Sequence, residues 1–305
     1  MRNRFGKWIT SAAHRNEKLI LLSGDIGFGI FDDFIREHPK KFINCGIAEQ
    51  NMIGVAAGLA ASGYLPIVYT IIPFLVCRPY EFIRNLIAYQ NLPVTLVGVG
   101  GGFSYDTLGH THYGLEDLNL MLGLPNFSVE LPCDPSAVDI CMDQIMLKTG
   151  PSYVRLMKGG EHDLRLVNDS NSSMPFIKRL KYCGNEFTIL THGGLVHEAL
   201  EACNLLESEH GIKGSVVTVL NGNIGGLPEL CCGDICVYEE NTFPGVFGKS
   251  LMQLESLKRV KVSRYVNNEI LGELSSRHAM LDRQSLSSKA MITDILSLDR
   301  SENYA

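Results

Sequence analysis

A single carboxylate, Glu49, stands at the head of a segment that is otherwise small and apolar, Met52 to Ala60. Gly54 and Gly58 are four residues apart, so they share one face of the predicted helix and let another backbone approach closely. Because an interior glycine costs a helix about 1 kcal/mol relative to alanine, the pair predicts a packing interface in which Glu49 is buried. A buried carboxylate can hold or share a proton near neutral pH. The alternative is an acidic residue favoured only by the helix dipole.

Three further segments carry side chains suited to chemistry. His112, which follows His110 and Thr111, offers an imidazole that can transfer protons near pH 7, or is an exposed bystander. Phe74 precedes a helical segment and offers an aromatic face to a flat heterocycle, unless it packs in the core. Arg155 has a fork of donors that suits a phosphate, and an equal alternative is a salt bridge in an edge strand.

The run around Glu49 resembles the transketolase superfamily of thiamine diphosphate enzymes, above all C-terminal transketolase subunits and 1-deoxyxylulose-5-phosphate synthase. The residues that carry the resemblance are Gly46-Ile47-Ala48-Glu49-Gln50-Asn51 and the small-residue helix after them. The resemblance implies that Glu49 contacts N1′ of the cofactor's aminopyrimidine. It implies that Phe74 stacks on this ring, with Tyr80 as the reserve choice. Further expected cofactor contacts are Asp25, Ile47 and Arg78.

The segment from Asp106 to Leu118 also resembles the family, which has Asp-Gly-Pro-Thr-His or Asp-Gly-Ala-Thr-His there. The resemblance implies that His112 is an active-site histidine that also contacts substrate, and that His110 is a second donor. It assigns Arg155, at the end of a Gly-Pro-x-x-x-Arg motif, to a substrate phosphate.

Two departures from the family pattern concern the substrate. Leu108 stands at a substrate-facing position where the family has an acidic residue, and Gly100 falls near the place of an upstream histidine. Both changes remove polar contacts to a sugar, so we expect an unusual acceptor rather than the ordinary pentose phosphates.

The sequence does not contain the Gly-Asp-Gly motif, followed 25–30 residues later by Asn, with which the family holds Mg²⁺ and the diphosphate. The nearest segments, Gly24-Asp25-Ile26 and Gly233-Asp234-Ile235, lack the third glycine. The resemblance therefore implies that Mg²⁺ is ligated by a separate N-terminal diphosphate-binding subunit and that this chain contributes no metal ligand. A dimer of heterodimers is the expected assembly.

The segments that must position these residues alternate between strand and helix. The pattern predicts strands at 18–25, 64–70, 93–99 and 152–156, and helices at 79–89 and 136–149. After a polar stretch it predicts strands at 187–191, 214–220 and 234–239, and helices at 197–210, 245–257 and 286–298. Such alternation is typical of α/β, doubly wound domains. We expect a parallel-sheet pyrimidine-binding domain at 1–165, a linker at 166–180, and a smaller mixed-sheet domain, like the transketolase C-terminal domain, at 181–305.

Composition narrows the class of protein. The chain has 305 residues and a net charge of −6, which argues against a nucleic-acid partner. No apolar run reaches the roughly 18 residues of a membrane span, and the N-terminal residues do not resemble a secretory signal. The nine cysteines include no Cys-x-x-Cys and are read as reduced thiols, with Cys236 buried rather than a zinc ligand. The expected compartment is the cytoplasm.

We therefore expect the C-terminal subunit of a transketolase-like transferase. It would move a two-carbon ketol unit from a ketose or ketose phosphate to an aldehyde or ketone sugar. Alternatives within the enzymes are a deoxyxylulose phosphate synthase-like carboligase and a 2-oxo acid dehydrogenase β-subunit. A non-catalytic homologue that only binds a partner is an alternative from another class.

Overall fold

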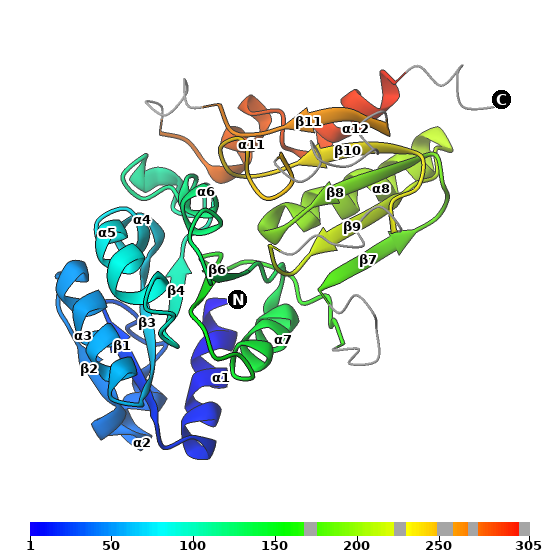
Figure 1. Ribbon diagram of the computed structural model, residues 1–305. Coiled ribbons are helices and arrows are strands. Elements are labelled where there is room, and N and C mark those ends of the chain that lie inside the picture. The colour runs from blue at the N-terminus through cyan, green and yellow to red at the C-terminus, as the bar shows by residue number, and fades with distance from the viewer. Residues whose placement is uncertain (168–175, 223–229, 249–258, 268–273, 299–305) are drawn as a thin grey trace.

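The computed structural model describes residues 1–167, 176–222, 230–248, 259–267 and 274–298, and contains two α/β units (Figure 1). The first is built on a parallel six-stranded sheet in the order β2-β1-β3-β4-β6-β5. Its strands are β1 (Leu19–Ser23), β2 (Phe42–Asn44), β3 (Leu65–Ile71), β4 (Thr95–Val99), β5 (Ser128–Glu130) and β6 (Ser152–Leu156). This confirms the α/β fold class with a parallel first sheet.

Each face of this sheet is covered by helices, because successive strand residues point to opposite faces. Leu19 and Leu21 pack with α1 (Arg2–Arg15) and α7 (Pro135–Ile145) in one core. Ile20 and Leu22 pack on the other face with α3 (Glu49–Ala61) and with the turns after β3. Those turns are α4 (Ile72–Val76), α5 (Tyr80–Phe82) and the π-helix η2 (Ile83–Ala88). Shorter helices α2 (Asp32–Glu37) and α6 (Asp117–Met121) complete the unit (Figure 1).

The second unit has a mixed five-stranded sheet in the order β11-β10-β8-β9-β7. Its strands are β7 (Ile177–Tyr182), β8 (Phe187–Thr191), β9 (Ser215–Val219), β10 (Asp234–Tyr238) and β11 (Val260–Arg264). Only β7 runs antiparallel to its neighbour. One face is covered by α8 (Val196–His210), α11 (Arg277–Arg283) and α12 (Ser288–Leu296). The mixed sheet agrees with the prediction.

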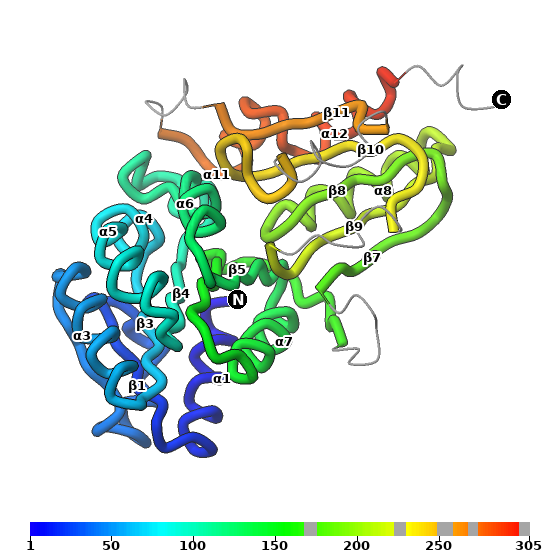
Figure 2. The backbone as a smooth tube through the Cα atoms, viewed as in Figure 1, coloured from blue at the N-terminus to red at the C-terminus, as the bar shows by residue number. Residues whose placement is uncertain are grey.

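The two units are joined by direct contacts as well as by the chain, whose path Figure 2 traces. The Leu131 amide donates to the Leu220 carbonyl at 2.7 Å, next to an isolated bridge between Glu130 and Asn221. The Glu240 carboxylate accepts from the Phe103 amide at 2.9 Å. These bonds dock the second unit beside the loop that follows β4.

The structure differs from the predicted elements in several places. The expected helix over 79–89 is a single turn of α-helix followed by a π-helix, which accommodates one residue more per turn. β7 begins at Ile177, inside the range predicted as linker, because it pairs with β9. The sequence pattern did not predict α1, although its buried residues follow helical spacing. Residues 249–257 of the helix expected at 245–257 lie outside the described residues.

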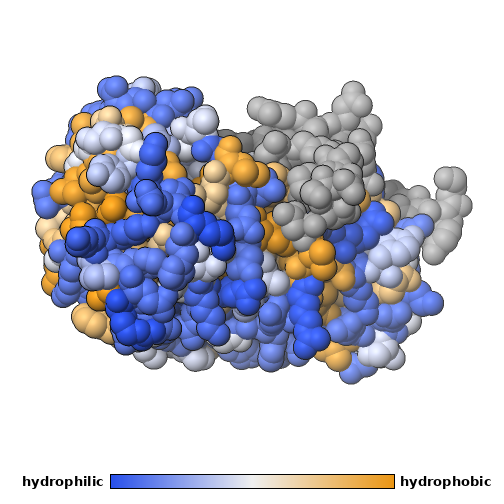
Figure 3. All heavy atoms as spheres, turned by 90° about the horizontal axis from the view of Figure 1, so that it is seen from below, coloured by the Kyte–Doolittle hydropathy of each residue, from blue (hydrophilic) through white to orange (hydrophobic). Residues whose placement is uncertain are grey.

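The surface is mainly polar, with hydrophobic side chains gathered toward the side on which Figure 1 shows α3 (Figure 3). Exposed large side chains from this part of the fold include Ile47, Leu86 and Tyr89. All nine cysteines are free thiols, and Cys236 is buried in β10 as expected. Among the described residues, no helix is both long and apolar enough to cross a membrane.

Candidate active site

The predicted site residues of the first unit follow successive parallel strands at one edge of the sheet. Asp25 follows β1, Glu49 follows β2 and Phe74 follows β3, while His112 lies on the loop after β4. Because all these strands are parallel, their carboxyl ends lie at the same edge. The strand order reverses between β1 and β3, and ligands of open α/β sheets bind at such a point.

Glu49 is a nearly buried carboxylate closed on one side by a single arginine. It is the first residue of α3, and its side chain is 5% exposed. Nη1 of Arg78 donates to both carboxylate oxygens, at 3.1 Å each. The Arg78 side chain is itself 48% exposed, so water screens its attraction for the carboxylate. Arg78 can therefore move away into solvent and leave Glu49 to another partner.

Phe74 lies directly beside this ion pair. The guanidinium carbon of Arg78 lies 4.1 Å from the centroid of the Phe74 ring. The His112 ring meets Phe74 edge to face, with 5.1 Å between centroids and 73° between planes. A flat cation is attracted to an aromatic face. The Phe74 ring thus already holds a planar, positively charged group next to the Glu49 carboxylate.

His112 is held as a neutral imidazole near pH 7. Partial burial, and after it the positive charge of Arg78, lowers the pKa of His112. One ring nitrogen, Nδ1, lies 2.9 Å from the Thr111 hydroxyl. A neutral imidazole has one donor and one acceptor nitrogen, so it can take up or release a proton beside Phe74.

The remaining expected cofactor contacts lie around this group at different distances from it. Asp25 has a φ of 59° and accepts from the Asn44 amide at 2.9 Å, while Asn44 in turn accepts from the Gly46 amide. These bonds fix the loop that leads into Glu49. Ile47 is 78% exposed at its edge. The Tyr80 hydroxyl donates to the Leu120 carbonyl at 3.1 Å, so this side chain is committed to α6 and Phe74 is the better candidate for stacking.

The expected substrate contacts are not all part of this group. Arg155 is buried in the interior strand β6, where it lies 3.2 Å from Asp117. Its Nη2 donates to the carbonyls of Gly114 and Glu240. This arrangement favours the salt-bridge alternative, although β6 is not an edge strand, and a phosphate contact stays a prediction. His110 and Leu108 are exposed on the loop that carries His112.

Two neighbours of the site were not anticipated from the sequence. The Tyr105 ring centroid lies 6.1 Å from that of His112, and the Lys158 ammonium lies 5.1 Å from the Tyr105 centroid. Lys158 comes two residues after β6. The convergence of residues that follow parallel strands would have indicated it.

The small-residue face of α3 is open within this chain. A Cβ atom built on Gly54 or on Gly58 would meet no described atom within 4 Å. The opposite side of the same helix, with Met52, Ile53 and Ala56, is fully buried. The close approach that the two glycines permit is therefore not used by the described residues of this chain.

Comparison with known proteins agrees with this geometry. The family model described as "Transketolase, pyrimidine binding domain" matches residues 1–160. A putative transketolase C-terminal section from Methanocaldococcus jannaschii is 33% identical over 71% of this chain and 69% of its own length. One of the two subunits of an apulose-4-phosphate transketolase from Actinobacillus succinogenes is 33% identical over 61% of this chain and 59% of its own length.

Solved structures agree over nearly the whole chain. A structure described as the inactive β4 tetramer of a split-gene transketolase covers 97% of this chain and 96% of its own, with 27% identity and a TM-score of 0.81. A transketolase from Campylobacter jejuni has the same TM-score at 20% identity, and there this chain spans only 46% of the longer protein. Since the family model covers more than half of the sequence, this chain belongs to the transketolase family and carries its pyrimidine-binding domain.

Proposed function

We propose that this chain is the pyrimidine-binding subunit of a two-subunit, thiamine diphosphate-dependent transketolase. It would transfer a two-carbon ketol unit from a ketose or ketose phosphate to an aldehyde or ketone sugar. The observation that carries the proposal is the nearly buried Glu49 carboxylate beside the Phe74 ring, with Arg78 as a displaceable partner.

The residues of the site fit the aminopyrimidine end of the cofactor. A carboxylate shielded from water suits a ring nitrogen that must keep or share a proton. The Phe74 face suits a flat, electron-poor ring, since it already holds the Arg78 guanidinium at stacking distance. When bound, thiamine diphosphate supplies the electron sink for breaking a carbon–carbon bond next to a carbonyl.

The chain's own residues would supply position and proton control. Glu49 would hold the proton at N1′ of the aminopyrimidine, once Arg78 has released its oxygens. Phe74 would orient the ring by offset stacking. His112, neutral because burial and Arg78 lower its pKa, would exchange a proton with a substrate oxygen. Arg78 would then be free to face the substrate or the cofactor from solvent.

A second polypeptide would complete the site. This sequence has no Gly-Asp-Gly motif to hold Mg²⁺ and a diphosphate. The relative from Actinobacillus succinogenes is named as a subunit, and the split-gene structure matches this chain along its whole length. We place association with another copy on the open Gly54–Gly58 face of α3, which supports an assembly of two such heterodimers.

Calorimetry of thiamine diphosphate and Mg²⁺ tests the proposal. The titration is made on this chain alone, and then on its mixture with a protein that carries the Gly-Asp-Gly motif. We expect binding in the mixture, and its loss in Glu49→Gln. The control is Glu81→Gln, which changes an exposed glutamate on α5 and should bind normally. Normal binding and turnover in Glu49→Gln would overturn the assignment. Absence of binding in both arms would favour the non-catalytic homologue.

A synthase-like reaction is the second candidate. A protein named 1-deoxy-D-xylulose-5-phosphate synthase 2, from Geobacter sulfurreducens, is 30% identical over 96% of this chain, which spans 48% of it. The two reactions differ in the donor, because the synthase type releases CO₂ from a 2-oxo acid. Measuring CO₂ release from pyruvate against ketol transfer from ketose phosphates, in the same reconstituted complex, separates them.

A further inference from the structure

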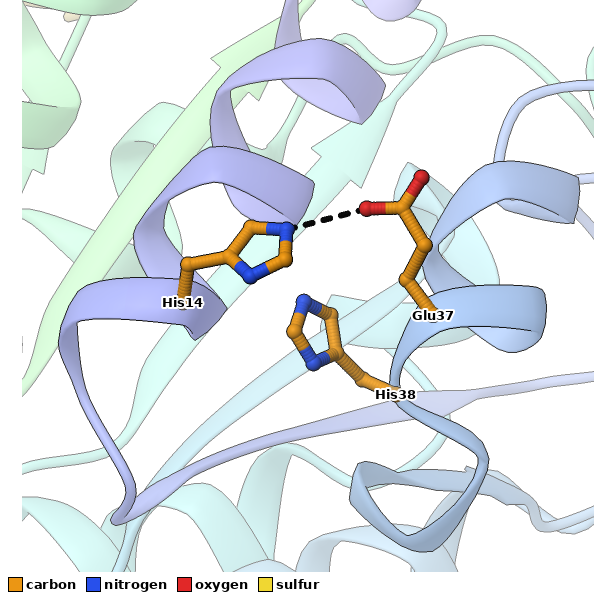
Figure 4. A group of neighbouring side chains, drawn as sticks. All are labelled: His14, Glu37 and His38. Carbon is orange, nitrogen blue, oxygen red and sulfur yellow. Dashed lines mark hydrogen bonds and ion pairs between the residues drawn. The ribbon is translucent and has the colours of Figure 1, made fainter.

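Three side chains of metal-ligating type converge where α1 and α2 end, away from the candidate active site. They are His14, Glu37 and His38 (Figure 4). One ligand atom from each can be chosen so that all three lie within 4.8 Å of one another. Nε2 of His14 lies 2.9 Å from Oε2 of Glu37, and the two imidazole centroids are 4.4 Å apart.

The His38 ring provides an independent sign of a missing ligand. Its Nε2 atom is buried and has no hydrogen-bond partner within the described part of the chain. In Figure 4 the ring turns one nitrogen toward His14 and Glu37. A buried imidazole nitrogen without a partner is unfavourable, because it has lost its bond to water. A cation between the three side chains would satisfy it.

The charges around the group favour a cation. The Glu37 carboxylate divides its oxygens: Oε1 accepts from Arg36 at 3.2 Å, and Oε2 faces His14. Asp33 pairs with the same Arg36 at 2.6 Å, so two carboxylates face one guanidinium. The group also lies at the carboxyl end of α1, the negative end of the helix dipole. With both imidazoles neutral, the local charge is about −1 before a metal binds.

We propose that His14, Glu37 and His38 form a binding site for a divalent transition metal of the zinc type. Two imidazole nitrogens and one carboxylate oxygen suit Zn²⁺, whereas Mg²⁺ prefers oxygen ligands alone. Tetrahedral coordination requires ligand atoms about 3.3 Å apart, given bonds of about 2.0–2.1 Å. His14 and Glu37 are 58% and 36% exposed, so their side chains are free to close this distance.

The fourth coordination position would remain open. His14 and Glu37 also line a groove of about 490 Å³ between α1 and α2, together with Asp33 and Lys7. Water or a small anionic ligand can reach the ion from this groove. The sequence alone predicted no metal ligand in this chain, because His14 is separated by more than twenty residues from the other two.

The site would be independent of the proposed transketolase function. α1 leads into β1, and α2 leads into β2, so His14 and His38 lie at the amino edge of the sheet. Glu49 follows β2 and lies at the opposite edge. Bound metal would therefore tie the end of α1 to the end of α2 and stabilise the fold without contacting the cofactor site.

Titration of the chelator-treated, full-length chain with Zn²⁺ and with Co²⁺ tests the proposal. We expect one ion per chain at this site, and at least tenfold weaker binding in His14→Ala and in His38→Ala. His278→Ala is the matched control, since His278 is an exposed histidine with a nearby carboxylate, Asp282 at 3.6 Å, and should bind as the wild type does. Zn²⁺ should raise the melting temperature of the wild type and the control only.

The nine free thiols are the main competing ligands, and Co²⁺ distinguishes them. Coordination by nitrogen and oxygen gives the Co²⁺ complex visible absorption bands without the charge-transfer band of a thiolate ligand. Undiminished binding in His14→Ala, or a thiolate band as the main signal, would overturn the proposal. Glu37→Gln serves as a second variant, because this exposed side chain can change without disturbing the Phe34–His38 contact. Melting temperatures in the presence of chelator verify that each variant is folded.

Discussion

The open face of α3 predicts that one substitution acts in opposite directions on the single chain and on its assembly. No described atom lies within 4 Å of a Cβ built on Gly58, so Gly58→Ala meets no obstacle within the chain. Alanine is favoured over glycine in a helix by about 0.8–1.0 kcal/mol. The free energy of unfolding of the isolated chain should therefore rise by about 1 kcal/mol. In a unit of this size, that raises the melting temperature by about 2–4 °C.

The assembly should respond with the opposite sign. If another backbone packs on the Gly54–Gly58 face, an added methyl group overpacks the contact and costs about 1–3 kcal/mol. The dissociation constant between chains should then increase by about 5- to 150-fold. Calorimetric melting at a concentration where the chain is monomeric measures the first effect, and analytical ultracentrifugation measures the second.

Gly6→Ala is the matched control. Gly6 also lies inside a helix, but a Cβ atom there would lie 2.6 Å from the Ile30 carbonyl oxygen. This variant should therefore lower the stability of the chain and leave association between chains unchanged. The reasoning would be refuted if Gly58→Ala destabilised the isolated chain. It would also be refuted if Gly58→Ala and the double variant with Gly54→Ala assembled as tightly as the wild type.

Three further predictions concern the site. Arg78→Ala leaves Glu49 nearly buried without its ion-pair partner; because Arg78 is half exposed, we expect a loss of about 1–2 kcal/mol in thermal denaturation rather than the 3–5 of a fully buried pair, and an unchanged stability would contradict this. Since the pKa of His112 is lowered in the fold, its contribution to stability is complete above about pH 6.5 and declines as the pH falls below that value. An NMR titration of Arg78→Ala should show the His112 pKa rising toward its ordinary value, and no rise would exclude Arg78 as a cause. Phe74→Ala should weaken cofactor binding about 2- to 13-fold, from a stacking energy of about 0.5–1.5 kcal/mol, whereas Tyr80→Phe loses only the bond to Leu120 and should bind normally in calorimetry; equal losses would contradict the choice of Phe74.

Local patterns were sufficient for the elements whose burial is simple. The runs that form β6 and β8 are apolar and short, and their predicted bounds agree with the structure. Where pairing with a distant segment decides, the prediction was weaker. β7 has polar, partly exposed side chains, and it is a strand because β9 pairs with it. The π-helix after α5 likewise depends on packing in its surroundings rather than on its own composition.

For the candidate site, the sequence by itself determined which residue types were available: a carboxylate before a small-residue helix, an aromatic before the next helix, and a histidine after a glycine-rich turn. Only the tertiary structure decided their partners. It paired Glu49 with Arg78, directed Arg155 to Asp117 and to two carbonyls, and turned Tyr80 to Leu120. It also brought His14 to Glu37 and His38. The physical reason is that periodicity reports which face of an element is buried, whereas partners depend on the order of strands in the sheet, which sets which chain segments meet.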